Sequence, residues 1–302
     1  MNRDELKAEY LRTVNDYMYD ILGKCQMLLS HLSIRREVSD ANPVLNDEII
    51  NLEKLNILSR GVVFCENFGE KKIPFLLTGI NPSYDGKGCN PWGILSYTFQ
   101  EKTTPPQNKK NWHNTYWGKK KKQFCNLCEE MAYFDLFPLI ESDQTSFERI
   151  FKKDTAFLGR LLELAQIHIE EMSPKLIVHA NRSSMYYWGI NNKDVIDRGA
   201  DVNNLKDPWM GYKVERVLEQ DVPPSMKKYD RYKLFPFYRI TGFIDSNNRI
   251  NNKKLLQTNL VGSYILEYVM ENRPQPDILY SNEDGKNEWT EIWKWVNQNY
   301  HK

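Results

Sequence analysis

The sequence has few cysteines, no long apolar run and no excess of either charge, and each of these absences excludes a class of protein. Only 5 of its 302 residues are cysteines, an odd number that is too small for a disulfide framework. Lys and Arg number 41 and Asp and Glu number 40, so the net charge of +1 predicts no polyanion-binding surface over the whole molecule. Any contact with nucleic acid therefore depends on local basic patches.

No segment is apolar over the ~20 residues that a membrane-spanning helix needs. The N-terminal segment MNRDELKAEYLRTVNDYMYD contains acidic residues early and no apolar core like that of a secretory signal. The low cysteine content is typical of a reducing compartment. We therefore expect a cytoplasmic protein without membrane association.

Two of the cysteines, Cys125 and Cys128, form a CxxC pair in FCNLCEE. One such pair without a second pair or nearby histidines is a weak metal signal, and the pattern around it is helical. We expect two half-buried thiols here, and we predict neither a metal site nor a cofactor.

Short apolar segments alternate with amphipathic segments along the chain. Strands are predicted at 61–67, 73–79, 131–139, 174–181 and 234–246, and helices at 3–33, 154–172, 253–272 and 286–300. A short helix is expected near 46–56. Residues 82–123 form a long irregular stretch, a kind of segment that is often functional.

Strands that are apolar without one-sided patterning are typical of a sheet covered on both faces. We therefore predict an α/β protein, a three-layer α/β/α sandwich with a mainly parallel central sheet. It forms a single domain over 1–302, with a helical extension at 1–60, an insertion at 190–232 and a C-terminal helix at 286–300. In such sheets ligands lie beyond the carboxyl ends of the strands.

The segment FLLTGINPSYDG ends a buried strand abruptly in a Gly-x-Asn-Pro turn, which presents the side chain of Asn81 at the edge of the sheet. An amide oxygen can accept a hydrogen bond from water but cannot act as a strong base. It suits a reaction whose transition state is already cationic, such as cleavage of a glycosidic bond. The alternative is that Gly79, Asn81 and Pro82 only shape a turn.

TGINPS resembles the first motif, G-[IM]-N-P-G, of the uracil-DNA glycosylase superfamily, especially of its mismatch-specific and single-strand-selective branches. The resemblance implies that Asn81 orients the attacking water. It also implies that the neighbouring residues Gly79, Ile80 and Pro82 contact the extruded base and that Ser83 contacts the nucleic acid.

The same family places an aromatic residue after this motif, where it stacks on the extruded base. The segments NPWG and SYTF lie at this position, so the resemblance makes Trp92 and Tyr97 the candidates, with Tyr84 behind them. Ordinary aromatic packing is the alternative for each.

YFDLFPL is similar to the family's strand that ends in N-Y-C-P-L, whose Asn reads the pyrimidine edge; here this position is Asp135. An ionised carboxylate offers only acceptors, so Asp135 suits a base that presents donors, such as the exocyclic amine of cytosine or adenine. The alternative is that Asp135 has a structural role and that uracil is not the ligand. LIVHAN occupies the position of a central strand without catalytic residues, so we expect His179 to be packed and hydrogen-bonded.

The family's last motif, typically H-P-S-P, lies in a loop that enters the minor groove, and here GFIDSNNRIN follows the corresponding strand. If Ser246 takes the catalytic Ser position, Ile244 replaces the His and offers no donor. Asn247 and Arg249 are then candidate phosphate or base contacts. A surface turn that caps a helix is the alternative. The chain does not supply the four suitably spaced cysteines of the iron–sulfur branch, so no cluster is expected.

Lysines and aromatic residues are interleaved in NKKNWHNTYWGKKKKQF, over 108–124. Lysines that follow phosphates and aromatics that stack on bases are typical of single-strand binding, and the candidate lysines are Lys119, Lys120 and Lys121. A solvated charged surface is the alternative.

The resemblance thus implies a DNA-repair enzyme that flips a nucleotide out of single- or double-stranded DNA and hydrolyses its N-glycosidic bond. Two alternatives stay open. The fold could bind nucleic acid or a protein without catalysis, or it could hydrolyse a free nucleoside or nucleotide.

Overall fold

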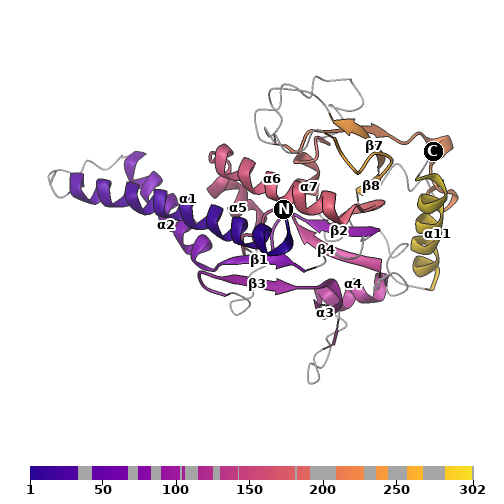
Figure 1. The fold of residues 1–302 in the computed structure, drawn as a ribbon, viewed down its shortest axis with the longest axis horizontal. Helices are drawn as coiled ribbons and strands as arrows, with labels where there is room; N and C mark the ends of the chain where they lie inside the picture. The colour runs from indigo at the N-terminus through magenta and orange to yellow at the C-terminus, as the bar shows by residue number, and fades with distance from the viewer. Residues whose placement is uncertain are drawn as a thin grey trace.

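The structure is a computed structural model, and Figure 1 shows a mixed α/β protein in which helices flank a mainly parallel sheet. It describes residues 1–32, 43–66, 74–82, 90–102, 104–105, 115–124, 130–141, 143–180, 182–190, 209–227, 236–243, 257–267 and 283–300. The predicted α/β class and the mainly parallel sheet are confirmed. Within these ranges, no helix is apolar over a length that would cross a membrane.

Six strands form the main sheet, in the order β4-β2-β5-β8-β7-β6. Their bounds are, in that order, Met131–Asp135, Phe75–Gly79, Leu176–His179, Tyr264–Glu267, Phe237–Phe243 and Tyr212–Arg216. The four strands β4, β2, β5 and β8 run parallel to one another, whereas β7 is antiparallel to both β8 and β6. The strands predicted at 73–79, 131–139, 174–181 and 234–246 are therefore confirmed within their described parts.

The strand order defines a point at which the chain changes direction across the sheet. From β2 the chain moves to β4 on one side, and from β4 it returns past β2 to β5 on the other. In open sheets of this order, the ligand crevice lies at the carboxyl ends of the strands beside that point. Asn81 follows the end of β2 at Gly79, so the predicted motif lies where this rule places a ligand.

Alternate side chains of the central strands pack into two separate apolar clusters. In β2, Leu76 belongs to a cluster that includes residues of α1 (Arg3–Leu32) and α6 (Thr155–Met172). Phe75 and Leu77 belong to the other cluster, with residues of α4 (Tyr116–Phe124) and α11 (Glu283–Asn299). A strand that is buried on both sides reads as a continuous apolar run, which explains why this segment shows no alternation.

A separate two-stranded sheet pairs β1 (Val62–Cys65) in parallel with β3 (Ile94–Tyr97). The Val63 backbone N–H donates to Pro138 O at 2.9 Å, so this sheet lies against the segment that follows β4. The strand predicted at 61–67 is confirmed. The expected irregular stretch at 82–123 is wrong for its described parts, which contain β3, α3 (Phe99–Lys102) and α4. Clustered Asn, Pro and Gly residues around these short elements predicted loops instead.

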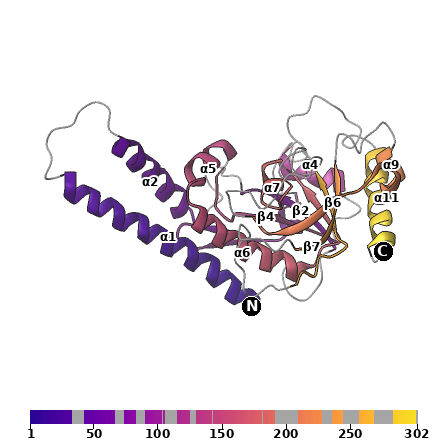
Figure 2. The same ribbon diagram turned by 90° about the horizontal axis from the view of Figure 1, so that it is seen from above.

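The helix predicted at 3–33 is α1, and the segment near 46–56 extends into the longer α2 (Pro43–Ser59). The two helices lie side by side and project beyond the sheet at the end of the molecule opposite α11 (Figures 1 and 2). The buried face of α1 consists of residues at helical spacing, namely Leu6, Tyr10, Val14, Met18 and Ile21.

Further helices are α5 (Gln144–Phe151), α7 (Arg182–Tyr186) and α9 (Pro224–Lys227), together with the 3-10 turn η4 (Glu219–Asp221). The helices α6 and α11 confirm those predicted at 154–172 and 286–300. α6 ends at Ser173, which has a left-handed φ of 47° and donates its backbone N–H to Ile169 O.

The prediction of a helix at 253–272 is wrong, because its described part contains β8. Leu260, Ile265 and Leu266 are compatible with helical spacing, but Gly262 has a φ of 91°, which ends any helix there. A Cβ at Gly262 would lie 2.5 Å from Tyr300 O, so only glycine fits this turn into the sheet. The segment 190–232, predicted to be an insertion, contributes β6, an edge strand of the main sheet.

Candidate functional site

The candidate site lies where β2 and β4 end side by side. Gly79 and Asp135 are paired in register at these ends, and the chain after β2 continues along the segment after β4. The Phe137 N–H donates to Ile80 O and the Glu141 N–H donates to Pro82 O, each at 2.9 Å. These bonds hold the GINP turn as an extension of the sheet edge rather than as a free loop.

The side chain of Asn81 is buried, with only 7 % of the residue exposed. Its Nδ2 donates to the backbone oxygen of Glu141, and more weakly to Pro82 O at 3.4 Å. Because a carbonyl oxygen only accepts, the amide nitrogen must face Glu141 and the amide oxygen must face the other way. Among the described residues Oδ1 has no hydrogen-bond partner. A buried acceptor without a partner is costly, so Asn81 Oδ1 needs a polar partner, such as an internal water.

A half-buried ion pair supports the segment that orients Asn81. Arg60 Nη1 donates to Glu141 Oε2 at 2.9 Å and to Ile140 O at 2.8 Å. Arg60 follows α2 directly, and it therefore ties the start of the small sheet to the segment after β4. Neither Arg60 nor Glu141 was selected from the sequence, because they are separated by about eighty residues and form no local motif.

Asp135 lies across the end of β2. The Tyr133 hydroxyl donates to Asp135 Oδ1 at 2.9 Å, and 6 % of Asp135 is exposed. A Cβ at Gly79 would lie 2.2 Å from Asp135 Oδ1 and 2.7 Å from the Tyr133 hydroxyl oxygen. Gly79 is thus required because these two side chains pass directly over its Cα, not because of its backbone conformation.

The surroundings of Asp135 decide its protonation near neutral pH. Burial raises the pKa of Asp135 to about 7, while the hydrogen bond from Tyr133 and the nearby charge of Lys102 act in the opposite direction. A protonated carboxyl group donates and accepts, whereas an ionised one only accepts. Asp135 therefore has both forms available at neutral pH, and the ionised form considered from the sequence is only one of them.

Aromatic rings stand beside Asp135. The Tyr97 ring lies 6.4 Å from the Tyr133 ring, and the Trp117 ring meets the Tyr133 ring edge-on at 4.8 Å. Lys102 Nζ lies 5.0 Å from the centre of the Tyr97 ring. The structure thus brings Tyr97 to the site, where it is buried as part of a wall. Tyr133 and Lys102 were missed in the sequence, although Tyr133 shares a strand face with Asp135.

Trp92 lies at the opposite end of β3 from Tyr97. Trp92 is exposed, with 56 % of its surface accessible to solvent. Its backbone φ of 61° is unusual for a residue with a bulky side chain. The Trp92 N–H donates to Ser59 O at 3.3 Å, next to Arg60. Trp92 is therefore near the ion pair that supports Asn81, and it is not part of the Tyr97–Tyr133 wall.

The three lysines of α4 differ in exposure. Lys119 is exposed, Lys121 is half-buried and Lys120 is fully buried. The expectation that Lys120 contacts phosphate is therefore corrected, because a side chain on the inner face of a helix cannot reach a polyanion at the surface. Several other predicted residues lie outside the described residues, namely Ser83, Tyr84, Cys125, Cys128, Ser246, Asn247 and Arg249.

His179 ends β5 and pairs with Thr78 on the opposite side of the sheet from Asp135. Its Nδ1 lies 2.5 Å from Ser184 Oγ, and its ring meets the Trp188 ring edge-on at 5.4 Å. Burial lowers the pKa of His179 to about 3, so the imidazole is neutral at physiological pH. The prediction of a packed, hydrogen-bonded histidine is confirmed.

The described residues contain no group of three or more side chains suited to holding a metal ion. Comparison of the chain with known protein families, with curated proteins and with solved structures found no match. The geometry at the carboxyl ends of β2 and β4 is therefore the main basis for assigning a function.

Proposed function

We propose that this chain is a three-layer α/β/α protein of the uracil-DNA glycosylase type, which acts in the cytoplasm and excises a base from DNA. The observation that carries the proposal is the buried Asn81 Oδ1, which has no partner among the described residues and is aimed by the bond from Nδ2 to Glu141 O. Asp135 stands on the same sheet edge, in register with Gly79.

In this reaction Asn81 Oδ1 accepts a hydrogen bond from a water molecule and thereby directs the water oxygen at C1′ of the sugar. The bond from C1′ to the base breaks with its electron pair on the base, the water oxygen bonds to C1′, and a water proton passes to solvent. The oxocarbenium-like transition state needs an oriented water more than a strong base. The neutral amide of Asn81 supplies orientation without charge.

Asp135 reads the edge of the flipped base. In its protonated form it offers one donor and one acceptor, the pattern that the family's Asn provides for uracil. In its ionised form it accepts from an exocyclic amine instead. Because burial raises the pKa of Asp135 to about 7, both modes are accessible, and base preference should vary with pH between about 6 and 8.

The surface around the edge suits a nucleic acid. Lys119 is exposed on α4 and can contact a phosphate, and the exposed ring of Trp92 offers a flat surface on which an unpaired base can stack. Flipping exposes such a base and delivers it to a site at the protein surface.

The alternative is a glycosylase-like fold that binds nucleic acid or a protein without catalysis. The engagement of Asp135 Oδ1 by the Tyr133 hydroxyl favours it, because that bond occupies part of the base-reading group. Binding of oligonucleotides that weakens steeply with salt, without release of any base, is the result expected of such a module.

The proposal is tested by incubating the purified protein with single- and double-stranded oligonucleotides that carry uracil, mismatched thymine, hypoxanthine or cytosine. Release of a free base, with an abasic site left in the strand, is the expected result. Retained binding without release supports the binding module. Absence of both release and binding at low salt overturns both nucleic-acid functions and leaves hydrolysis of free nucleosides or nucleotides as the activity to assay.

A further inference from the structure

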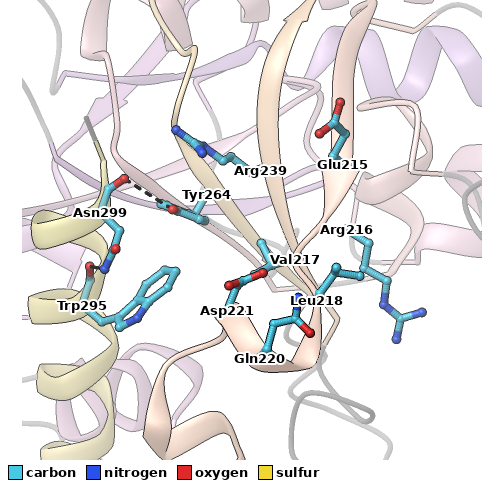
Figure 3. Close-up of a pocket in the computed structure, with 10 residues that line it drawn as sticks. All are labelled: Glu215, Arg216, Val217, Leu218, Gln220, Asp221, Arg239, Tyr264, Trp295 and Asn299. Carbon is cyan, nitrogen blue, oxygen red and sulfur yellow. Dashed lines mark hydrogen bonds between the residues drawn. The ribbon is translucent and has the colours of Figure 1, made fainter. Parts of the chain in front are cut away.

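A cavity of about 520 Å³ lies over the other end of the main sheet, away from β4 and β2 (Figure 3). Its volume is within the range of about 300–1,000 Å³ that is typical of small-molecule sites. Strands β6, β7 and β8 form its floor, α11 forms one wall, and the segment 217–221 forms the other. Nothing in the proposed base-excision chemistry uses this cavity.

Three side chains cross the floor in one row. Glu215 pairs with Arg239, and Arg239 pairs with Tyr264, so the three residues lie side by side on one face of adjacent strands. The Arg239 guanidinium carbon lies 5.9 Å from the centre of the Tyr264 ring. Glu215 Oε1 lies 3.7 Å from Lys213 Nζ, and the Glu215 side chain points towards solvent.

Arg239 is half-buried, and its guanidinium lies over the Tyr264 ring without an ion pair or hydrogen bond to any described residue. A guanidinium group presents several N–H donors in a planar fork that fits a carboxylate. Because Arg239 is half-buried beside an open cavity, water solvates these donors and they stay accessible to an anionic group of a ligand.

The walls supply a ring surface and an opposite charge. The Trp295 ring meets the Tyr264 ring edge-on at 5.1 Å, and the Asn299 side chain donates to Trp295 O at 2.8 Å, which fixes this part of α11 (Figure 3). Asp221 faces the cavity from the other wall. Burial and the negative charge of Asp221 raise the pKa of Tyr264 while Arg239 lowers it, so an anion and a cation both lie near one phenol.

The charges decide between classes of ligand. Of the four charged side chains around the cavity, Glu215, Arg216, Asp221 and Arg239, the cation Arg239 and the anion Asp221 are the two that lie near the Tyr264 ring. A dianionic nucleotide gains little net attraction from such a lining, whereas a zwitterion can satisfy a cation and an anion at once. The aromatic wall favours a flat apolar group on the same molecule.

We propose that the cavity between α11 and β6–β7–β8 is a binding site for a small zwitterion with an aromatic side chain, of the class of the free aromatic amino acids. The carboxylate of the ligand binds the Arg239 guanidinium, its ammonium group binds Asp221, and its ring packs on Trp295. The site is independent of the proposed base excision, and each can fail without the other.

The test is isothermal titration calorimetry of the full chain with four probes: L-tryptophan, tryptamine, which lacks the carboxylate, indole-3-propionate, which lacks the ammonium group, and adenosine monophosphate. We expect L-tryptophan to bind about tenfold more tightly than the other three, because it alone supplies both a carboxylate for Arg239 and an ammonium group for Asp221. Similar affinity for all three indoles, tighter binding of the nucleotide, or no binding of L-tryptophan overturns the proposal.

Two variants separate the charges from the fold. Arg239→Gln should remove the preference for L-tryptophan over tryptamine, and Asp221→Asn should remove the preference over indole-3-propionate. Arg149→Gln changes an exposed arginine on α5 and should leave all affinities within about twofold of the wild type. Melting curves of the three variants verify folding, and a cavity variant that folds but keeps its preference contradicts the assigned contacts.

Discussion

The two ends of the main sheet hold their polar side chains in opposite ways. At the ends of β2 and β4, Asn81 and Asp135 are buried and fixed by neighbours. Over β6, β7 and β8, charged side chains line an open cavity, and the Arg239 guanidinium makes no ion pair or hydrogen bond with a described residue. Burial fixes geometry but disfavours charge, as the raised pKa of Asp135 shows. The first arrangement suits the orientation of a neutral water, and the second suits the capture of a charged molecule.

The largest effect is expected from Gly79→Ala, which adds a methyl group at the crowded end of β2. The added Cβ would lie 2.2 Å from Asp135 Oδ1, so Asp135 and Tyr133 must move. We expect the free energy of unfolding to fall by about 3 kcal/mol or more and base release to be lost. Chemical denaturation measures the first and release of the base measures the second.

Gly23→Ala is the matched control for this substitution. No atom outside the neighbouring backbone of α1 lies within 4 Å of the added Cβ of Gly23, which is on the exposed part of this helix. This change should stabilise the protein by about 0.5–1 kcal/mol. If both alanine variants are equally stable, the close approach of Asp135 to Gly79 is wrong.

The next largest effect is expected from Asp135→Asn, which should remove a pH dependence of the free energy of unfolding. The pKa of Asp135 is higher in the folded protein, at about 7, than its ordinary value of 3.8, so the folded state binds more protons between these values. The free energy of unfolding of the wild type therefore falls as pH rises from about 4 to about 7. Asparagine keeps an acceptor for Tyr133 but does not ionise.

We expect the variant to exceed the wild type in stability by at least about 2 kcal/mol at pH 8 and to lose this advantage towards pH 4. Urea titrations of both proteins across this range measure the difference. A difference that is constant with pH shows that Asp135 is ionised throughout the range and contradicts the buried environment described for it.

A smaller effect is expected from Arg60→Gln, which removes the ion pair with Glu141 but leaves Asn81 in place. The loss of a half-buried pair at 2.9 Å should lower the free energy of unfolding by about 1 kcal/mol. Base release should fall by about tenfold, because Glu141 O then holds the amide of Asn81 less rigidly. Binding in the cavity over β6–β8 should not change, which keeps the two regions distinct.

Single-turnover kinetics and denaturation together check this prediction. Arg149→Gln removes an exposed pair with Glu53 and should change stability by less than about 0.5 kcal/mol and leave base release unaltered. Equal effects of the two arginine variants on base release would show that Arg60 has no positioning role.

Local patterns predicted much of the fold. The apolar segments that became β1, β2, β4, β5 and β7 lie between turn residues, and α6 has a continuous apolar stripe over Thr155–Met172. β8 was predicted as a helix because Leu260, Ile265 and Leu266 fit both periods. The left-handed turn at Gly262 and the pairing of β8 between β5 and β7 decide in favour of a strand.

The candidate site was predictable where it depends on strand ends and unpredictable where it depends on distant contacts. Asn81 and Asp135 each follow or end an apolar strand, and parallel neighbours bring such ends together. Arg60 reaches Glu141 from another part of the chain, and the burial of Lys120 depends on which face of α4 points inward. The cavity combines residues from 215 to 299, which no local motif connects.

The most direct test of the central claim compares single-turnover base release by the wild type, Asn81→Ala and Asn297→Ala on the best oligonucleotide substrate. Asn297 is an exposed asparagine on α11 and serves as the matched control. We expect Asn81→Ala to lower the rate by about 100-fold or more while the folded protein still binds the oligonucleotide, and we expect Asn297→Ala to have no effect. Release by Asn81→Ala at the rate of the wild type would contradict the assignment of Asn81 as the group that orients the water.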